Sequence, residues 1–300
     1  MGFLVVDKPV GWTSHDVVDA ARRWLGIRRV GHLGTLDPLA TGVLPLAVRE
    51  ATKLVPFLPS EKTYVGTIRL GISTDTYDAE GRITGRCDGP QPGEAEVREA
   101  LQRFVGEIEQ VPPMFSSVKK DGVPLYRLAR AGQEVERAPR RVRIHEIRMH
   151  HYAPPEIGIE VRCTAGTYVR TLAADLGQKL GCGAHLAGLR RTRSGPFLAS
   201  QARSPDALAE LAERGALEEV LIPPEQAMGL GRVRLSPAQA RRMAHGGDLP
   251  VAEARGEFER EPLPPRPGTR LAAMAPSGTL LAVVELRPDR RLHPLRVLSR

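Results

Sequence analysis

Asp37 is the residue in this chain best suited to do chemistry. It lies in the loop Gly31-His32-Leu33-Gly34-Thr35-Leu36-Asp37-Pro38-Leu39-Ala40-Thr41-Gly42. Leu36 and Leu39 flank it, and Pro38 fixes the backbone directly after it. A carboxylate among apolar neighbours is poorly hydrated and keeps its charge only beside a cation. Because Asp and Gly also favour ordinary turns, the loop alone predicts either a functional carboxylate or a simple capped turn.

The segments around this loop are expected to anchor it in a core. Residues 3–6 form an apolar run typical of a strand, and a helix is expected over 16–25, capped by Thr13 or Ser14. The apolar run 43–48 predicts a buried strand directly after the loop, followed by a helix over about 50–58. The loop should therefore lead straight into the interior.

A possible cation for Asp37 comes from much later in the chain. The strand expected at 157–163 leads to Gly166-Thr167-Tyr168-Val169-Arg170, and residues 171–180 read as a helix. Arg170 therefore lies at a strand-to-helix junction, from which it could reach a buried carboxylate. Residues 71–81 form an acidic loop without the ligand spacing of an EF-hand, and we expect it to hold no metal.

Charge and composition favour a polyanionic partner. The net charge is +8, and the basic excess gathers in residues 119–148, 176–205 and 229–300. Three basic segments beside acidic ones favour nucleic acid binding over general solubility. The three cysteines form no CxxC pair, which fits reduced thiols in a cytoplasmic protein better than disulfides or a zinc site. No segment predicts a signal peptide or a membrane span.

Several motifs in this order resemble the bacterial TruB family, the tRNA pseudouridine-55 synthases. Besides the Asp37 loop, the matching stretches are Leu4-Val5-Val6-Asp7-Lys8-Pro9, Glu50-Ala51-Thr52-Lys53, Lys62-Thr63-Tyr64, Gly166 to Thr171, and Gly181 to Leu186 with Leu189-Arg190-Arg191. The resemblance is firm from about residue 3 to residue 195 and weaker beyond. Ordered motifs of this kind are far more specific than one glycine loop.

The resemblance implies an α+β fold with a mixed, largely antiparallel sheet, surrounded by helices and loops. A catalytic domain would span 1–228 and carry a basic, mobile, RNA-gripping insertion at about 112–143. A small, mostly-β, PUA-like RNA-binding domain would span 229–300, with closing strands at 280–286 and 292–298. We expect a monomer.

The resemblance also assigns roles to residues. Asp37 would be catalytic, Arg170 would be its ionic partner, and Tyr64 would stack on a flipped pyrimidine. Tyr168 and Leu189 match base-pocket positions. His32 would help to open the RNA loop or fill the vacated space, although a structural histidine is an equal reading. The residues expected to contact the RNA backbone are Lys8, Arg140, Arg141, Arg143, Arg190 and Arg191.

The implied reaction isomerises one uridine in the T-arm loop of tRNA to pseudouridine. It needs neither redox chemistry nor an energy donor, and we expect no cofactor. Two alternatives are a guide-dependent, dyskerin-type ribosomal RNA pseudouridine synthase and a non-catalytic tRNA-folding chaperone. The basic insertion, and a chain that starts directly at the first expected strand, favour an enzyme that needs no guide RNA. The combination of Asp37, Tyr64 and Arg170 favours catalysis.

Overall fold

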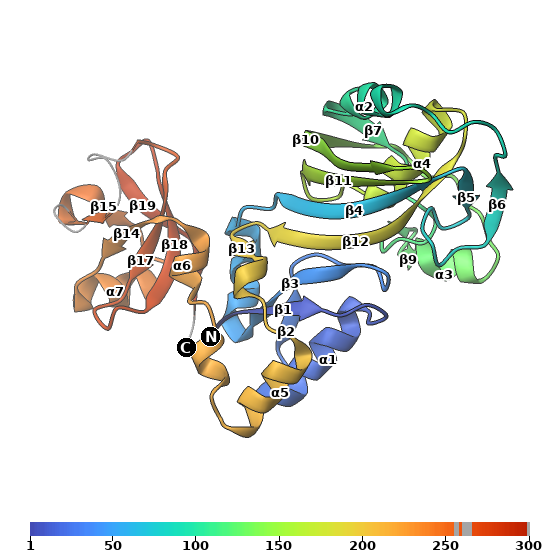
Figure 1. Cartoon of the computed structure of the whole chain (residues 1–300). Helices are drawn as coiled ribbons and strands as arrows, with labels where there is room; N and C mark the ends of the chain where they lie inside the picture. Colours follow the sequence, from blue (N-terminus) through green and yellow to red (C-terminus); the bar gives the residue numbers. More distant parts are fainter. Residues whose placement is uncertain (255–257, 260–265, 299–300) are drawn as a thin grey trace.

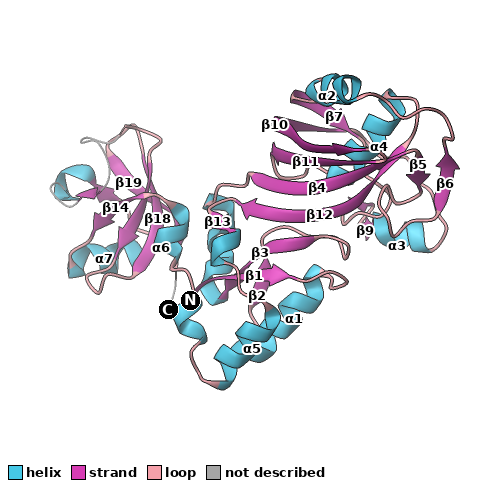
Figure 2. Ribbon diagram, viewed as in Figure 1, coloured by secondary structure: helices cyan, strands magenta, loops and turns pink. Residues whose placement is uncertain are grey.

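The protein, described here by a computed structural model, consists of a large α+β unit and a smaller β-rich unit (Figures 1 and 2). The structure describes residues 1–254, the backbone of 258–259, and residues 266–298. None of the helices in these ranges is long and apolar enough to cross a membrane.

The main sheet is divided into two halves. Its strand order is β1 (Gly2–Lys8), β3 (Thr41–Val48), β12 (Ala184–Ser194), β4 (Lys62–Leu70), β11 (Glu156–Cys163), β10 (Arg140–Ala153) and β7 (Gly106–Gln110). β2 (Val30–His32) adds to β3, and β13 (Phe197–Leu198) adds to β12. All neighbours are antiparallel except β3 and β12, which pair only through Arg190 with Thr41 and Arg191 with Gly42. Beyond this short contact the two strands diverge, as Figure 1 shows.

Helices cover each half of the sheet. α1 (Ser14–Leu25) and α5 (Pro205–Glu213) lie together against the β1–β3 half, whereas α4 (Val169–Lys179) and α2 (Glu94–Gln102) pack on the other half (Figure 2). The expected start of α1 is confirmed, because Thr13 caps it and forms a reciprocal capping box with Asp16. Gly26 ends the helix in the left-handed conformation. Both halves share one apolar core.

Three local expectations need correction. Residues 49–57 form a 3₁₀ segment, η1 (Arg49–Phe57), with Pro56 inside it, rather than an α-helix. α4 begins at Val169, so Arg170 lies within its first turn. The acidic loop at 71–81 is partly ordered by a hairpin of β5 (Ile72–Thr74) and β6 (Ile83–Arg86).

The basic insertion is shorter than expected. It leaves the sheet after β7 and contains β8 (Lys119–Lys120), β9 (Val123–Pro124) and α3 (Leu125–Arg130). The residues from Arg140 to Ile144 pair regularly with the residues from Gln110 back to Gly106. The basic cluster at 140–143 therefore belongs to strand β10, and its expected placement on a mobile insertion is wrong.

The C-terminal unit is a second sheet that packs against the first. Its order is β15 (Leu249–Pro250), β19 (Arg291–Val297), β18 (Leu280–Leu286), β17 (Arg270–Met274), β14 (Gly231–Arg234) and β16 (Phe258–Glu259). Short helical elements accompany the sheets, namely η2 (Ala199–Gln201), η3 (Leu217–Val220), α6 (Pro224–Met228), α7 (Pro237–Ala244) and η4 (Val251–Ala254). The expected closing strands are confirmed as β18 and β19.

One apolar cluster joins the two units. Phe3 and Val43 of the first sheet belong to the same buried cluster as Ala272 and Val283 of the second. The rings of Phe3 and Phe197 lie 5.3 Å apart within it. Because this surface is buried only when the units are together, they should fold as one cooperative body.

Candidate active site

Asp37 lies in a pocket at the place where the two halves of the sheet diverge. The cavity has a volume of about 270 Å³. Its walls come from the Asp37 loop, from β4 and β12, from residues 165–170, and from Ser116 and Ser117 at the start of the insertion. The pocket is therefore built from segments far apart in the sequence.

The Asp37 loop is fixed to the first half of the sheet by hydrogen bonds. The Ser14 hydroxyl accepts from the Leu36 N–H at 2.8 Å and donates to the Leu36 carbonyl at 3.1 Å. The Pro38 carbonyl accepts from the Gly11 N–H at 2.9 Å and from Lys8 Nζ at 3.2 Å. The backbone groups on both sides of Asp37 are thus held before any substrate arrives.

Lys8 serves this anchoring and not phosphate binding. Its side chain is fully buried, and Nζ also donates to the carbonyls of Pro9 at 2.9 Å and Trp12 at 2.5 Å. Burial lowers its pKa to about 8, partly opposed by the charge of Asp37. The expected contact between Lys8 and an RNA phosphate is wrong for this structure, because no Lys8 surface is accessible.

Arg191 holds the loop from the opposite half of the sheet. It is 1% exposed, and it donates to the carbonyls of Val43 at 2.7 Å, Gly34 at 3.1 Å and Thr35 at 3.4 Å. Gly42 packs so closely here, with φ of +98°, that a Cβ would lie 2.3 Å from the Arg191 carbonyl oxygen. Arg191 was also expected to bind the RNA backbone, and its burial contradicts that expectation.

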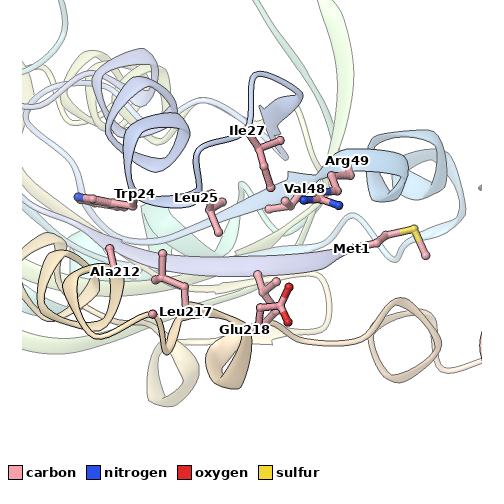
Figure 3. A pocket seen from close by; sticks show the side chains of 11 residues that line it. Met1, Trp24, Leu25, Ile27, Val48, Arg49, Ala212, Leu217 and Glu218 are labelled. Atoms are coloured by element: carbon pink, nitrogen blue, oxygen red, sulfur yellow. The ribbon is translucent and has the colours of Figure 1, made fainter.

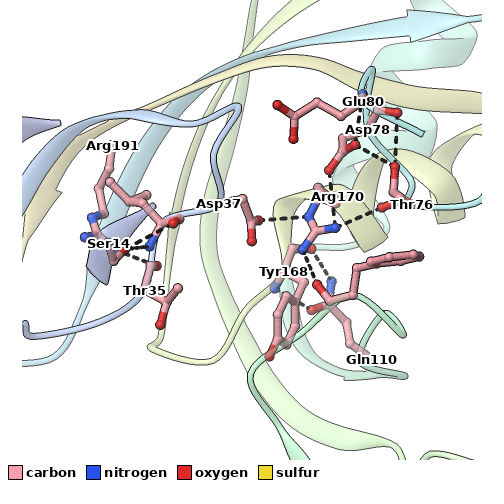
Figure 4. Close-up of polar contacts among 12 residues, drawn as sticks. Ser14, Thr35, Asp37, Thr76, Asp78, Glu80, Gln110, Tyr168, Arg170 and Arg191 are labelled. Carbon is pink, nitrogen blue, oxygen red and sulfur yellow. Dashed lines mark hydrogen bonds and ion pairs between the residues drawn. The ribbon is translucent and has the colours of Figure 1, made fainter. Parts of the chain in front are cut away.

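Arg170 is held between two carboxylates, as Figure 4 shows. Its Nε lies 2.9 Å from Asp37 Oδ2, and one terminal nitrogen lies 3.2 Å from Asp78 Oδ2. The two terminal nitrogens also donate to the carbonyls of Thr76 at 3.0 Å and Phe115 at 2.9 Å. The contact with Asp37 is an ion pair without hydrogen-bond alignment, since Nε has no aligned acceptor. The two terminal nitrogens of the guanidinium are therefore used within the protein, and only Nε faces Asp37.

Opposing influences set the protonation of Asp37. Burial raises the pKa of the carboxyl, the charge of Arg170 lowers it, and the neighbouring charge of Asp78 raises it again. The net direction is upward. The side chain nevertheless keeps 36% of its surface exposed, on the wall of the pocket. Asp37 is thus a partly desolvated carboxylate with access to a bound molecule.

Asp78 contacts Arg170 at the candidate site, and the sequence did not single it out. Its side chain is 4% exposed, accepts a hydrogen bond from the Thr76 hydroxyl at 2.6 Å, and also accepts from the Glu80 N–H at 3.1 Å. Burial, followed by the charges of Asp78 and Asp37, raises the pKa of nearby Glu80. The only signal in the sequence was an acidic turn, which usually indicates solvent exposure.

Tyr64, Tyr168 and Leu189 line the same pocket as Asp37. Burial raises the pKa of both tyrosines, so their hydroxyls are neutral near pH 7. The backbone of Tyr168 is fixed by Gln110, whose side chain accepts from its N–H at 3.0 Å and donates to its carbonyl at 3.3 Å. The structure brings these three side chains together, while their roles toward a base stay predictions.

His32 lies apart from this group. It ends β2, is exposed, and does not line the pocket. Although the residue is exposed overall, desolvation of its ring by the surrounding protein, together with the charge of Arg191, lowers its pKa, so it is mainly neutral near pH 7. Its position outside the pocket fits contact with a bound polymer better than contact with the reacting base, and that contact stays a prediction.

The remaining expected phosphate contacts differ in availability. Arg140, Arg141 and Arg143 are exposed on β10, and Arg141 has only a loose contact with Glu109 at 3.8 Å. Arg190 is half-buried and forms a bidentate pair with Asp7, at 2.9 and 2.7 Å. The β10 arginines are therefore free to meet phosphates, whereas the Arg190 charge is already matched.

Two further observations concern the described residues as a whole. Within the described ranges, no group of three or more His, Cys, Asp or Glu residues could hold a metal ion. A separate cavity of about 190 Å³ lies beside the end of α1 and near η3 (Figure 3). Most of the residues that line it are apolar, and its charged lining residues are Arg49 and Glu218.

Comparisons with known sequences match this chain to one protein family. The model of the TruB family pseudouridylate synthase N-terminal domain matches residues 22–169, and the tRNA pseudouridylate synthase B C-terminal domain matches residues 170–229. A tRNA pseudouridine synthase B of Geotalea uraniireducens is 46% identical over 286 residues, covering 95% of this chain and 91% of that protein. The protein of the same name from Pseudomonas aeruginosa is 43% identical, covering 99% and 95%.

Solved structures show the same architecture. One chain of a Cbf5-Nop10-Gar1 complex superposes with a TM-score of 0.72 at 28% identity, covering 99% of this chain and 84% of that one. One chain of an H/ACA RNP bound to a substrate RNA gives a TM-score of 0.73 at 26% identity, covering 100% and 85%. With matched sequence over most of its length, a shared fold and an aspartate pocket at the centre of that fold, this chain belongs to the TruB family of pseudouridine synthases.

Proposed function

We propose that the protein isomerises uridine 55, in the T-arm loop of tRNA, to pseudouridine, without a guide RNA or a cofactor. The observation that carries this proposal is the pocket in which Asp37 contacts Arg170 beside Tyr64, Tyr168 and Leu189. It offers one reactive carboxylate, a cation fixed directly beside that carboxylate, and a mostly apolar wall. A single carboxylate is sufficient for an isomerisation that needs no electron donor.

Each group has a defined task in this proposal. The target base leaves its stack and enters the pocket, where Tyr64 and Leu189 enclose it. Asp37 then attacks the ribose as a nucleophile or removes a proton from it, and both roles need the charged carboxylate. Arg170 opposes the burial that favours the neutral acid, because its charge lowers the pKa of Asp37 and thus favours the ionised carboxylate.

Phosphate contacts outside the pocket would supply most of the affinity. The exposed arginines 140, 141 and 143 lie on a rigid strand, and the insertion that precedes them lines the pocket through Ser116 and Ser117. RNA held by this surface would lie directly over the entrance. In this proposal residues 1–228 catalyse and residues 229–300 bind RNA, in a cytoplasmic enzyme that acts as a monomer.

One assay tests the proposal against both alternatives. The purified protein is incubated alone with an unmodified tRNA transcript, and pseudouridine is mapped by position, with Asp37→Asn as the matched inactive control. We expect product at position 55 from the wild type only. Product that requires an added guide RNA would favour the dyskerin-type alternative. Tight tRNA binding without product from the wild type would favour the chaperone.

A further inference from the structure

Two buried cations on one wall of the Asp37 pocket lack carboxylate partners. Lys62 of β4 is 8% exposed, Arg191 of β12 is 1% exposed, and both line the cavity. Among the described residues, neither has a carboxylate within 4.0 Å. Burying a charge without a counter-ion is costly, so this arrangement needs a compensating reason.

The strand register places both cations beside the expected position of the base. Lys62 and Tyr64 are two residues apart on β4, so their side chains share one face of the strand. Arg191 pairs with Tyr64 across the β12–β4 ladder, and Ser194 pairs with Lys62. The two positive charges thus flank the aromatic ring that would enclose a flipped pyrimidine.

Each cation keeps donor capacity after its bonds within the protein. Lys62 Nζ donates to the Ser194 hydroxyl at 2.6 Å and to the Leu33 carbonyl at 3.3 Å, which leaves one of its three N–H groups. Arg191 uses three of its five N–H groups on the carbonyls of Gly34, Thr35 and Val43, and the Tyr64 hydroxyl lies beside it. The wall is therefore able to donate to a bound, negatively charged group.

We propose that Lys62, supported by Arg191, is a further catalytic residue that stabilises the negative charge on the departing uracil. This inference rests on the proposed function. When the bond between C1′ and N1 breaks, its electron pair goes to the base, and the charge spreads to the two carbonyl oxygens. Asp37 meanwhile bonds to the ribose or takes its proton. C5 of the turned base then bonds to C1′, while the bond between Asp37 and the ribose breaks or Asp37 returns the ribose proton, so the carboxylate is regenerated. C5 loses its proton and N1 gains one, so the product is an isomer.

A fixed cation is well suited to this step because the charge develops only as the bond breaks. Donors already oriented toward that charge need no reorganisation, and in a desolvated pocket they act more strongly than in water. Burial, together with the charge of Arg191, lowers the pKa of Lys62 to about 8. The other groups facing Lys62 do not match its charge at neutral pH, since burial raises the pKa of Cys163 to about 11, and Glu61 contacts His145 and Arg162 instead.

The test compares three variants in single-turnover assays with saturating T-arm stem-loop. Lys62→Met removes the charge and the donors, whereas Lys62→Gln removes the charge and retains an N–H donor for Leu33 or Ser194. We expect both to slow the reaction about 100-fold, which is in the range seen when one oxyanion donor is removed. RNA affinity should stay within about twofold of wild type. Ser194→Ala removes an acceptor and no charge, and we expect a loss of less than about threefold.

The pH profile provides an independent measurement on the wild type itself. At limiting RNA, the rate should fall above pH 8 as Lys62 loses its proton, and Lys62→Met should lack this alkaline limb. A near-normal rate in Lys62→Gln would show that Lys62 only holds the loop through hydrogen bonds, and an alkaline limb that persists in Lys62→Met would equally overturn the proposal. If the wild type makes no pseudouridine at all, the proposed function fails instead. Thermal midpoints of all variants identify any that are misfolded.

Discussion

Replacing Arg170 by methionine should disable Asp37 without removing it. Arg170 is 4% exposed and lies 2.9 Å from Asp37 and 3.2 Å from Asp78. Methionine fills similar space but supplies no charge and no donors, so it leaves two carboxylates facing each other. The carbonyls of Thr76 and Phe115 lose their donors as well. We therefore expect a loss of both stability and rate.

The magnitude follows from the two distances. At an effective dielectric constant of about 20, each contact is worth roughly 5–6 kcal/mol of Coulomb energy. The Asp37 side chain is 36% exposed, so solvent screening reduces its share. Breaking a buried pair by removing one partner costs about 3–5 kcal/mol, and we expect unfolding free energy to fall by that amount.

The effect on catalysis should appear in the pH profile. The charge of Arg170 is the main influence that lowers the pKa of Asp37 against burial. Each 1.4 kcal/mol of lost attraction raises a pKa by about one unit, so the acidic limb should move up by more than one pH unit. Saturating single-turnover rates between pH 5 and 9 measure this shift. Arg170→Lys keeps the charge, so we expect a clear rate loss, residual activity and a smaller shift.

Asp78→Asn is the matched comparison because it perturbs the same network with the opposite sign. The charge of Asp78 raises the pKa of Asp37, so its removal should move the acidic limb down.

The alternative interpretation is that Arg170 only contacts a phosphate of the RNA. In that case Arg170→Met would weaken RNA binding while its saturating rate and pH profile matched wild type, and the assigned pairing would be refuted.

Further predictions concern the carboxylate, the RNA grip, metals and the domain contact. Asp37→Asn should form no pseudouridine yet keep its RNA affinity. Because folding raises the pKa of Asp37, the neutral acid stabilises the folded wild type, and this stabilisation is lost as the pH rises through that pKa. The asparagine does not titrate, so the thermal midpoint of the variant relative to wild type should increase from acidic to neutral pH. Changing Arg140, Arg141 and Arg143 together to glutamine should reduce the slope of log affinity against log salt by about two to three units, and an unchanged slope would place the RNA elsewhere. Activity on a prefolded stem-loop should survive EDTA, and loss that zinc restores would reveal a missed metal site. Deleting 229–300 should lower the thermal midpoint of the remainder, because the deletion exposes part of a shared apolar cluster; an unchanged midpoint would show that the units fold independently.

The sequence by itself determined most secondary elements and the identity of the central carboxylate. Local signals were sufficient where one segment decides its own structure, as in the capping box at Thr13 and the apolar run that becomes β3. The resemblance to the TruB family was carried by short ordered motifs, which is why both the family and Asp37 could be named before the fold was known. Local signals failed at η1, where the expected helix is a 3₁₀ segment.

Only the tertiary structure decided which charged residues are buried within the fold and which stay exposed. Lys8, Arg191 and Arg140 look alike in sequence as basic residues near motifs. In the structure the first two are buried on loop carbonyls, while Arg140 is exposed on a strand. Burial depends on strand pairings between residues as distant as Arg191 and Tyr64, and no local pattern encodes those pairings.

The same reason explains Asp78. The sequence of its turn predicts an exposed, polar segment, yet Asp78 is buried against α4 and forms an ion pair with Arg170. A charged side chain is stable in such a place only if a specific partner meets it there, and that partner lies 92 residues away on another element. The residue types were visible in the sequence; their pairing, and hence their chemistry, depended on the meeting of the two halves of the sheet.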